Sequence, residues 1–194
     1  MCFWTKIYTI RSREVTGLIY YKGKFYYVTW NGQIWFFEVA GSRVRQPIVG
    51  PRFLIWHRED VRFNQGAVRY YLVELSGALL FVCRYSCGKG CQTYKFKVCE
   101  LDVTNGHLDE IDTLRDSALF LGFNKSHSFD SSRFIGVKPN YIYFTDDWYE
   151  EKDMEYRGGR DMRAYNLEDG SIEAFYVGSS VCCLSPPMWV TPSI

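Results

Sequence analysis

Apolar and polar residues alternate with a period of two along most of the chain, which is the pattern of β-strands on a half-buried sheet. No stretch of ten or more residues carries apolar positions at helical spacing, so the sequence predicts an all-β fold. Nine strands are expected, at residues 18–21, 25–30, 34–39, 70–74, 79–84, 93–102, 140–145, 162–166 and 172–176.

Short turns separate many of these strands. Each turn contains a glycine, the residue that most easily adopts the positive φ of a tight hairpin turn. The expected turns are Lys22-Gly23, Asn31-Gly32, Ser76-Gly77, Asn105-Gly106 and Asp169-Gly170. The chain therefore reads as a string of β-hairpins.

A weak internal repeat groups the strands into three units. In each unit, a strand rich in aromatic or aliphatic residues (25–30, 79–84, 142–147) precedes a strand that carries an acidic residue and ends at a glycine turn (36–44, 99–108, 165–172). The turn glycines Gly41, Gly106 and Gly170 lie 65 and 64 residues apart. Propeller blades repeat every ~40–50 residues, so these spacings fit four-stranded blades that carry loop insertions.

The repeat therefore predicts a β-propeller-like fold with about three to four blades of antiparallel strands. Because complete propellers have ~4–8 blades, this chain is expected to form a partial, incomplete propeller. A β-sandwich or barrel uses similar short strands and stays open as the competing architecture.

Composition restricts the class of protein. The 194 residues are 47% apolar and 23% charged, with 23 basic against 22 acidic side chains, which excludes a disordered chain and predicts a single globular domain over 1–194. Aromatic residues make up 18% of the chain, as suits pleated, half-buried strands. The aromatics are therefore expected to pack between blades, and a nucleic-acid partner is not expected.

The sequence pattern predicts neither a signal peptide nor a transmembrane segment. The uncharged C-terminal stretch 178–194 contains Pro186, Pro187 and Pro192, which would interrupt a membrane-spanning helix, so no membrane partner is expected. The seven cysteines are best read as reduced thiols. Together these features predict an intracellular protein, located in the cytoplasm, the nucleus or both.

Several long motifs resemble one known family. They occupy residues 17–35, 92–106, 116–124, 138–148, 160–173 and 185–193. In this order they look like the KIB-type β-propeller domain of plant F-box proteins. The resemblance implies a single, partial KIB-type domain over 1–194. It also implies a non-catalytic module for protein-protein interaction that recruits substrates to cullin-RING ubiquitin ligases.

Members of that family usually carry an N-terminal F-box, a helical segment that binds a Skp1-type adaptor. The present sequence has no Leu-Pro-rich segment of that kind. A Skp1-type adaptor is therefore expected as a partner only if an F-box is supplied elsewhere. Self-association is expected if the propeller is incomplete, because unpaired strand edges and apolar blade faces would be exposed.

Candidate chemistry is sparse. Cys83, Cys87, Cys91 and Cys99 have spacings that approach those of a zinc site, but a core or turn role fits them better, so no metal is expected. None of the histidines His57, His107 and His127 lies in a catalytic motif, and no phosphate-binding loop is present. We therefore expect no catalytic residue, no cofactor and no enzyme activity.

One long, charged and aromatic loop, residues 146–161, is the candidate contact site. Trp, Tyr and Arg are the side chains that most often anchor protein interfaces, and loops on a rigid scaffold carry binding function. The expected partner-binding residues are Trp148, Tyr149, Glu150, Glu151, Tyr156, Arg157 and Arg160. The alternative function is a propeller-type carbohydrate-binding protein or glycosidase that uses acidic and aromatic side chains around a pocket.

Charge is unevenly distributed along the sequence. Residues 1–69 contain 11 Lys and Arg against four Asp and Glu, a net charge of +7, and the remaining residues carry a net −6. Opposite charges on two sectors of one fold favour a partner of complementary charge and give an electrostatic route to self-association.

Overall fold

The computed structural model describes residues 15–40, 43–44, 67–87, 92–122, 125–145, 161–174 and 189. Within these residues the chain forms 14 strands and one 3-10 helix, Ser131–Arg133, which confirms the prediction of an all-β fold. The described part of the chain contains no helix with the length and apolar character needed to cross a bilayer.

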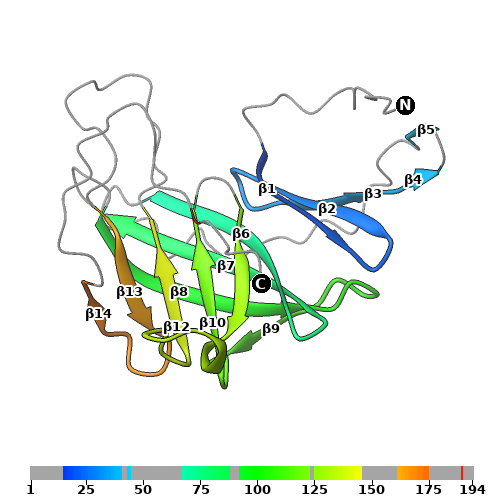
Figure 1. The fold of residues 1–194 in the computed structure, drawn as a ribbon. Coiled ribbons are helices and arrows are strands. Elements are labelled where there is room, and N and C mark those ends of the chain that lie inside the picture. The colour runs from blue at the N-terminus through cyan, green and yellow to red at the C-terminus, as the bar shows by residue number, and fades with distance from the viewer. Residues whose placement is uncertain are drawn as a thin grey trace.

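Three of the sheets are stacked (Figure 1). The first sheet contains the antiparallel strands β1 (Val15–Tyr21), β2 (Lys24–Thr29) and β3 (Ile34–Phe37). It is followed by a two-stranded ribbon, β4 (Val39–Ala40) and β5 (Arg43–Val44). The middle sheet is a meander of β6 (Ala67–Leu75), β7 (Ala78–Cys87), β8 (Gln92–Leu101) and β9 (Leu108–Ile111).

The third sheet has five strands in the order β11-β10-β12-β13-β14. Their bounds are β10 (Ser117–Leu121), β11 (His127–Asp130), β12 (Tyr141–Phe144), β13 (Arg163–Asn166) and β14 (Ile172–Glu173). Neighbouring strands are antiparallel except β10 and β12, which are parallel.

The parallel pair follows from how the chain returns after β11. The 3-10 helix and the turn behind it bring Asn140 back to the start of β10, where the Asn140 amide donates to the Ser117 carbonyl (2.8 Å). The Asn140 side-chain oxygen also accepts from the Leu114 amide (2.7 Å). The next strand, β12, therefore begins beside the first residue of β10 and runs in the same direction.

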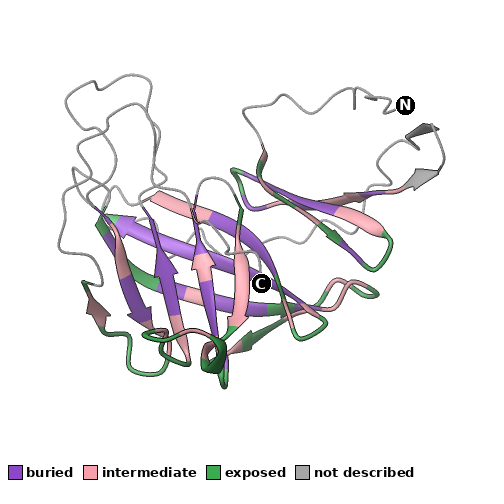
Figure 2. Ribbon diagram, in the orientation of Figure 1, coloured by how far each residue is buried: buried purple, intermediate pink, exposed green. Residues whose placement is uncertain are grey.

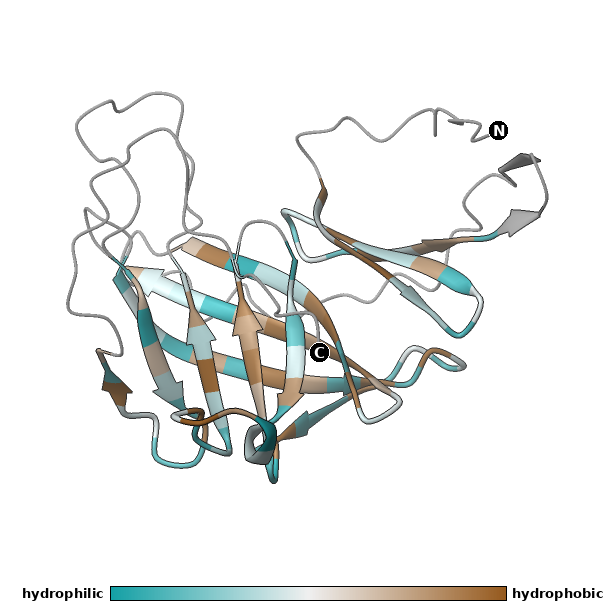
Figure 3. Ribbon diagram, in the orientation of Figure 1, coloured by the Kyte–Doolittle hydropathy of each residue, from teal (hydrophilic) through white to brown (hydrophobic). Residues whose placement is uncertain are grey.

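The central strands of the middle sheet, above all β7, are buried on both faces (Figure 2). Toward the first sheet, Leu79 and Phe81 pack in one apolar cluster with Tyr26 and Val28. Toward the third sheet, Leu80 and other side chains pack in a second cluster. A strand buried on both faces needs an uninterrupted apolar run, and β7 has one. In Figure 3, hydrophobic residues lie along the strands of the stack.

The predicted repeat corresponds to the sheets, one unit in each. Its first strands fall on β2, β7 and β12, and its second strands include β3, β8 and β13. The five predicted hairpin turns are confirmed, each with a glycine at positive φ. Local sequence was sufficient here because hairpin turns and strand alternation are both short-range signals.

Four strands lie outside the nine ranges expected from the sequence, namely β5, β9, β10 and β11. Strand β9 is LDEI, with two acidic residues that are exposed at the edge of the middle sheet, and β11 is HSFD, with no fully buried residue. Neither strand shows clear apolar alternation. Strand β7 extends beyond the expected range 79–84 to Ser86 and Cys87, which pair with Thr93 and Gln92.

Replacing Leu80 by Ala should lower the free energy of unfolding by about 2–5 kcal/mol, because it leaves a cavity in the core between the middle and third sheets. The matched control is Leu18→Ala on β1, where the side chain is 55% exposed, and it should change stability far less. Urea unfolding followed by tryptophan fluorescence measures both. Equal effects at the two positions would contradict the stacked arrangement.

Candidate functional site

The predicted contact residues, from Trp148 to Arg160, lie outside the described residues. Within the predicted 146–161 loop, residues 146–160 lie in the sequence between Thr145 and Asp161, which are both described and both buried. At the base of the loop, a polar network joins the middle sheet to the third sheet.

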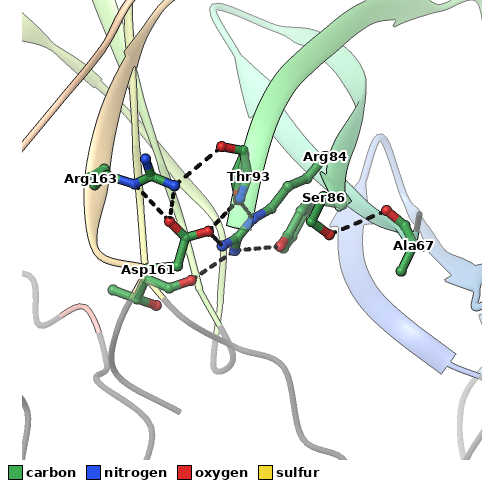
Figure 4. A network of polar contacts seen from close by, with 8 residues as sticks. Ala67, Arg84, Ser86, Thr93, Asp161 and Arg163 are labelled. Carbon is green, nitrogen blue, oxygen red and sulfur yellow. Dashed lines mark hydrogen bonds and ion pairs between the residues drawn. The ribbon is translucent and has the colours of Figure 1, made fainter. Parts of the chain in front are cut away.

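Arg84 is the centre of this network (Figure 4). It follows Leu80 and Val82 on the same face of β7, and its side chain is completely buried. Its Nε donates to the Thr93 hydroxyl (2.7 Å), one terminal nitrogen donates to the Thr145 carbonyl (2.8 Å), and the other contacts the Asp161 carboxylate (3.0 Å). A single guanidinium thus binds the residues on both sides of the loop.

Asp161, two residues before β13 of the third sheet, completes the network. Its Oδ2 accepts from the Thr93 amide (2.8 Å) and the Thr93 hydroxyl (2.6 Å) in addition to Arg84. Its Oδ1 accepts from Arg163, whose guanidinium also donates to the Thr93 carbonyl (3.2 Å). Thr93 and the Asp161 carboxylate therefore each accept hydrogen bonds from both arginines.

The aromatic ring of Phe144 supports the two cations. The guanidinium carbon of Arg84 lies 4.6 Å from the ring centroid, and that of Arg163 lies 6.0 Å from it. Tyr71 also accepts a long hydrogen bond from Arg84 (3.4 Å). Cation-π contacts are strongest where water is excluded, so the ring helps to offset the desolvation of Arg84.

The charges around Asp161 determine its protonation. Burial by itself raises the pKa of this carboxyl, but hydrogen bonds from Thr93 and the charges of Arg84 and Arg163 outweigh it, and the pKa lies below its ordinary value. The group is therefore ionised at neutral pH, where it forms a buried ion pair with Arg84.

Several strand ends meet at this edge of the stack. The Ser86 hydroxyl donates to the Ala67 carbonyl (3.3 Å), and the Thr145 amide donates to the Leu121 carbonyl (3.1 Å). Several segments of the sequence connect to strands at or near these ends, namely 45–66, 88–91, 123–124 and 146–160.

Sequence reasoning did not identify Arg84, although a lone charge at the end of the apolar run LLFVCR was a usable signal.

A cleft of about 670 Å³ lies at the other end of the stack, near the β6-β7 turn and the connection from β9 to β10. The described residues that line it include one aromatic side chain, Phe129, and the acidic residues Glu100, Glu110, Asp112, Asp116 and Asp130. Glu110 pairs with Lys97 (2.6 Å). The hydroxyl and amide of Ser132 lower the pKa of Asp130. Sequence reasoning did not predict this cleft.

Two of the cysteines considered for zinc, Cys83 on β7 and Cys99 on β8, lie on paired strands. Cys83 and Cys99 are buried, Cys87 is exposed at the end of β7, and Cys91 lies outside the described residues. Burial raises the pKa of the Cys83 and Cys99 thiols, which lowers their reactivity. Among the residues that the structure describes, no group of three or more His, Cys, Asp or Glu side chains is placed to hold a metal ion.

The histidines that the structure describes have ordinary surroundings. His107 is exposed in a hairpin turn and lies 3.2 Å from Asp109. His127 stacks on Phe129, and burial together with the charge of Lys125 lowers its pKa. His57 lies outside the described residues.

Comparison with protein families identifies the fold. The KIB1-4 β-propeller family matches residues 2–166, which is most of the chain. The protein belongs to this family. The resemblance recognised in the sequence motifs is thereby confirmed, and so is the expectation of an all-β, partial propeller. Neither a search of the curated proteins nor a search of the solved structures returned a match.

Because the chain belongs to the KIB1-4 family, the three stacked sheets are propeller blades. In a propeller, each blade packs its faces against its neighbours, and the two apolar clusters of the middle blade are those interfaces. The Arg84 network lies at the end of the interface between the middle and third blades.

Replacing Arg84 by Met should destabilise the protein by about 3–5 kcal/mol, because it leaves the buried Asp161 carboxylate without its ion-pair partner on the middle blade. The double variant Arg84→Met, Asp161→Leu should recover part of this loss. Urea unfolding of the single and double variants measures the coupling. Lys138→Met, which breaks the exposed pair with Glu173, is the control and should change little. A double variant no more stable than Arg84→Met would contradict the buried pair.

Stability should also fall in acid through Asp161. Because its folded pKa lies below the ordinary value of 3.8, its contribution is complete above pH 3.8 and is lost as the pH drops through the folded pKa. Asp161→Asn should therefore be less stable than the wild type at pH 6, and the difference should narrow below pH 3.8. Urea midpoints measured across this range test the sign. A difference that widens in acid would contradict it.

Proposed function

We propose that this propeller domain is a non-catalytic module for protein-protein interaction. The single observation that supports it is the Arg84 network, which fixes both ends of the 146–160 loop to the same buried guanidinium. A binding loop with anchored ends loses less conformational entropy when a partner binds. A scaffold of packed blades with a loop held in this way is typical of binding surfaces.

The proposed contacts are the loop residues identified in the sequence. Trp148, Tyr149 and Tyr156 offer large amphipathic surfaces, and Arg157 and Arg160 offer charged hydrogen-bond donors. Glu150 and Glu151 would select against an acidic partner surface. No nucleic acid, membrane, metal or cofactor takes part in this proposal.

A finer role follows from the KIB-type resemblance. We infer that the domain recruits substrate proteins to a cullin-RING ubiquitin ligase in the cytoplasm or nucleus of a plant cell. The link to the ligase would need a Skp1-type adaptor and an F-box supplied elsewhere. The target protein would be recognised by surface complementarity, with no bond made or broken by this chain.

The alternative is a carbohydrate-binding protein or glycosidase that uses the acidic cleft. Sugar-binding sites usually stack the ligand on aromatic rings, and Phe129 is the one aromatic side chain among the described residues of the cleft. A general acid needs a raised pKa, whereas the pKa of Asp130 is lowered. Both points favour the interaction function.

The test is affinity purification of the tagged full chain from plant cell extract, with retained proteins quantified by mass spectrometry. The variant Trp148→Ala, Tyr149→Ala should reduce the specifically retained proteins at least about tenfold, as expected for interface anchors. Trp30→Ala removes a tryptophan that is 63% exposed on the first blade and should leave the retained set unchanged.

Two results would contradict the proposal. One is that the wild type and the Trp148→Ala, Tyr149→Ala variant retain the same proteins, when urea unfolding shows that this variant and the Trp30→Ala control are folded. The other is turnover of an aryl glycoside by the wild type that Asp130→Asn abolishes, since that outcome would assign the function to the cleft.

A further inference from the structure

Trp189 packs against the third blade, although at least 15 residues separate it in sequence from the last strand of that blade, β14. Its indole Nε1 donates to the Leu121 carbonyl (2.8 Å). Its ring meets the ring of Phe120 edge to face, with centroids 4.9 Å apart and planes at 87°. Both the polar and the apolar part of the side chain thus have a defined partner.

The blade surface under the indole is shaped for an aromatic side chain. Phe120 stacks on Tyr143, with ring centroids 4.8 Å apart, and forms the wall that Trp189 contacts. Ala118 and Ala164 belong to the same cluster, and their short side chains are buried. This cluster is on the face of the third blade that points away from the middle blade, since the alternate residues Leu119 and Leu121 pack toward the middle blade.

Gly122 gives the strongest sign of a fitted site. A Cβ atom at this position would lie 3.1 Å from Cδ1 of Trp189 and 3.3 Å from its Nε1. It would also lie 2.8 Å from the Thr145 hydroxyl oxygen, closer than real Cβ atoms approach. The indole therefore occupies space that is open only because residue 122 has no side chain.

The site is connected to the Arg84 network through the backbone. The Leu121 carbonyl accepts from the Trp189 indole and from the Thr145 amide (3.1 Å), while the Thr145 carbonyl accepts from Arg84 (2.8 Å). A carbonyl oxygen has two lone pairs, so both bonds to Leu121 form together. The position of the indole acceptor is thus fixed by the interface between the middle and third blades.

We propose that Phe120, Leu121, Gly122 and Tyr143 form a binding site for a tryptophan-bearing peptide segment, which the chain's own C-terminal Trp189 occupies. The occupant supplies an aromatic edge for Phe120 and an N–H donor for Leu121. It covers part of the outer face of the third blade, the type of face that a neighbouring blade covers elsewhere in the stack. This inference does not depend on the proposed function.

An intramolecular occupant acts at a high effective concentration, typically in the millimolar range for short flexible connections. A free peptide with the same sequence should therefore bind the wild type weakly. It should bind well once the internal tryptophan is removed. This difference distinguishes a specific site from non-specific binding of the peptide to the blade surface.

The experiment uses the full chain with Trp189→Ala and a fluorescently labelled synthetic peptide of residues 184–194. Fluorescence anisotropy should show saturable binding at least about tenfold tighter than to the wild type, because the internal competitor is gone. A peptide with Trp189→Ala should not bind. Adding Gly122→Val to the protein should abolish binding, because the new side chain fills the indole position.

Equal peptide binding to the wild type and to folded Trp189→Ala protein, or no binding to either, would overturn the proposal. If Trp189→Ala does not fold, fluorine NMR of the full chain labelled with 5-fluorotryptophan decides instead. The chain has six tryptophans, and Trp189→Phe assigns the resonance of residue 189. Gly122→Ala should shift that resonance toward the solvent-exposed position. An unchanged resonance would refute the site.

Discussion

The buried guanidinium of Arg84 is the constraint on which the arrangement of this protein depends. A charge without access to water is tolerated only when its donors are satisfied and a countercharge is near, and here those partners come from two blades. Apolar burial is not directional, so it defines the relative position of neighbouring blades less sharply than hydrogen bonds do. The directional bonds of Arg84 to Thr93, Thr145 and Asp161 set one relative position of the two blades. That position in turn fixes the base of the loop and the Leu121 carbonyl that accepts from Trp189.

The two ends of the blade stack differ in their electrostatics. At the Arg84 end, two arginines share one carboxylate, and the side chains of Arg84 and Asp161 are buried. At the other end, five acidic side chains line a cleft that is open to solvent. All five of these acids belong to residues 70–194, the portion of the sequence that carries the net negative charge.

Local features of this fold could be predicted from the sequence, and long-range ones could not. The hairpin turns, the strands of the repeat and their division among three blades depend on neighbouring residues and emerged correctly. The pair Arg84 and Asp161 spans 77 residues, and the contact of Trp189 with Leu121 spans 68, so no local pattern marks either one. Strand β11 was missed for a different reason, because an edge strand with no buried side chain has no alternation to detect.

The burial of the middle blade on both faces also determines how the protein must come apart. Neither outer blade can leave without exposing one whole apolar face of the middle blade to water, so the loss of one interface weakens the support for the next. Solenoid repeats with modest interfaces can unfold from their ends in steps. Here the large shared interfaces and the ion pair that crosses one of them couple the blades, and the three blades should behave as one cooperative unit.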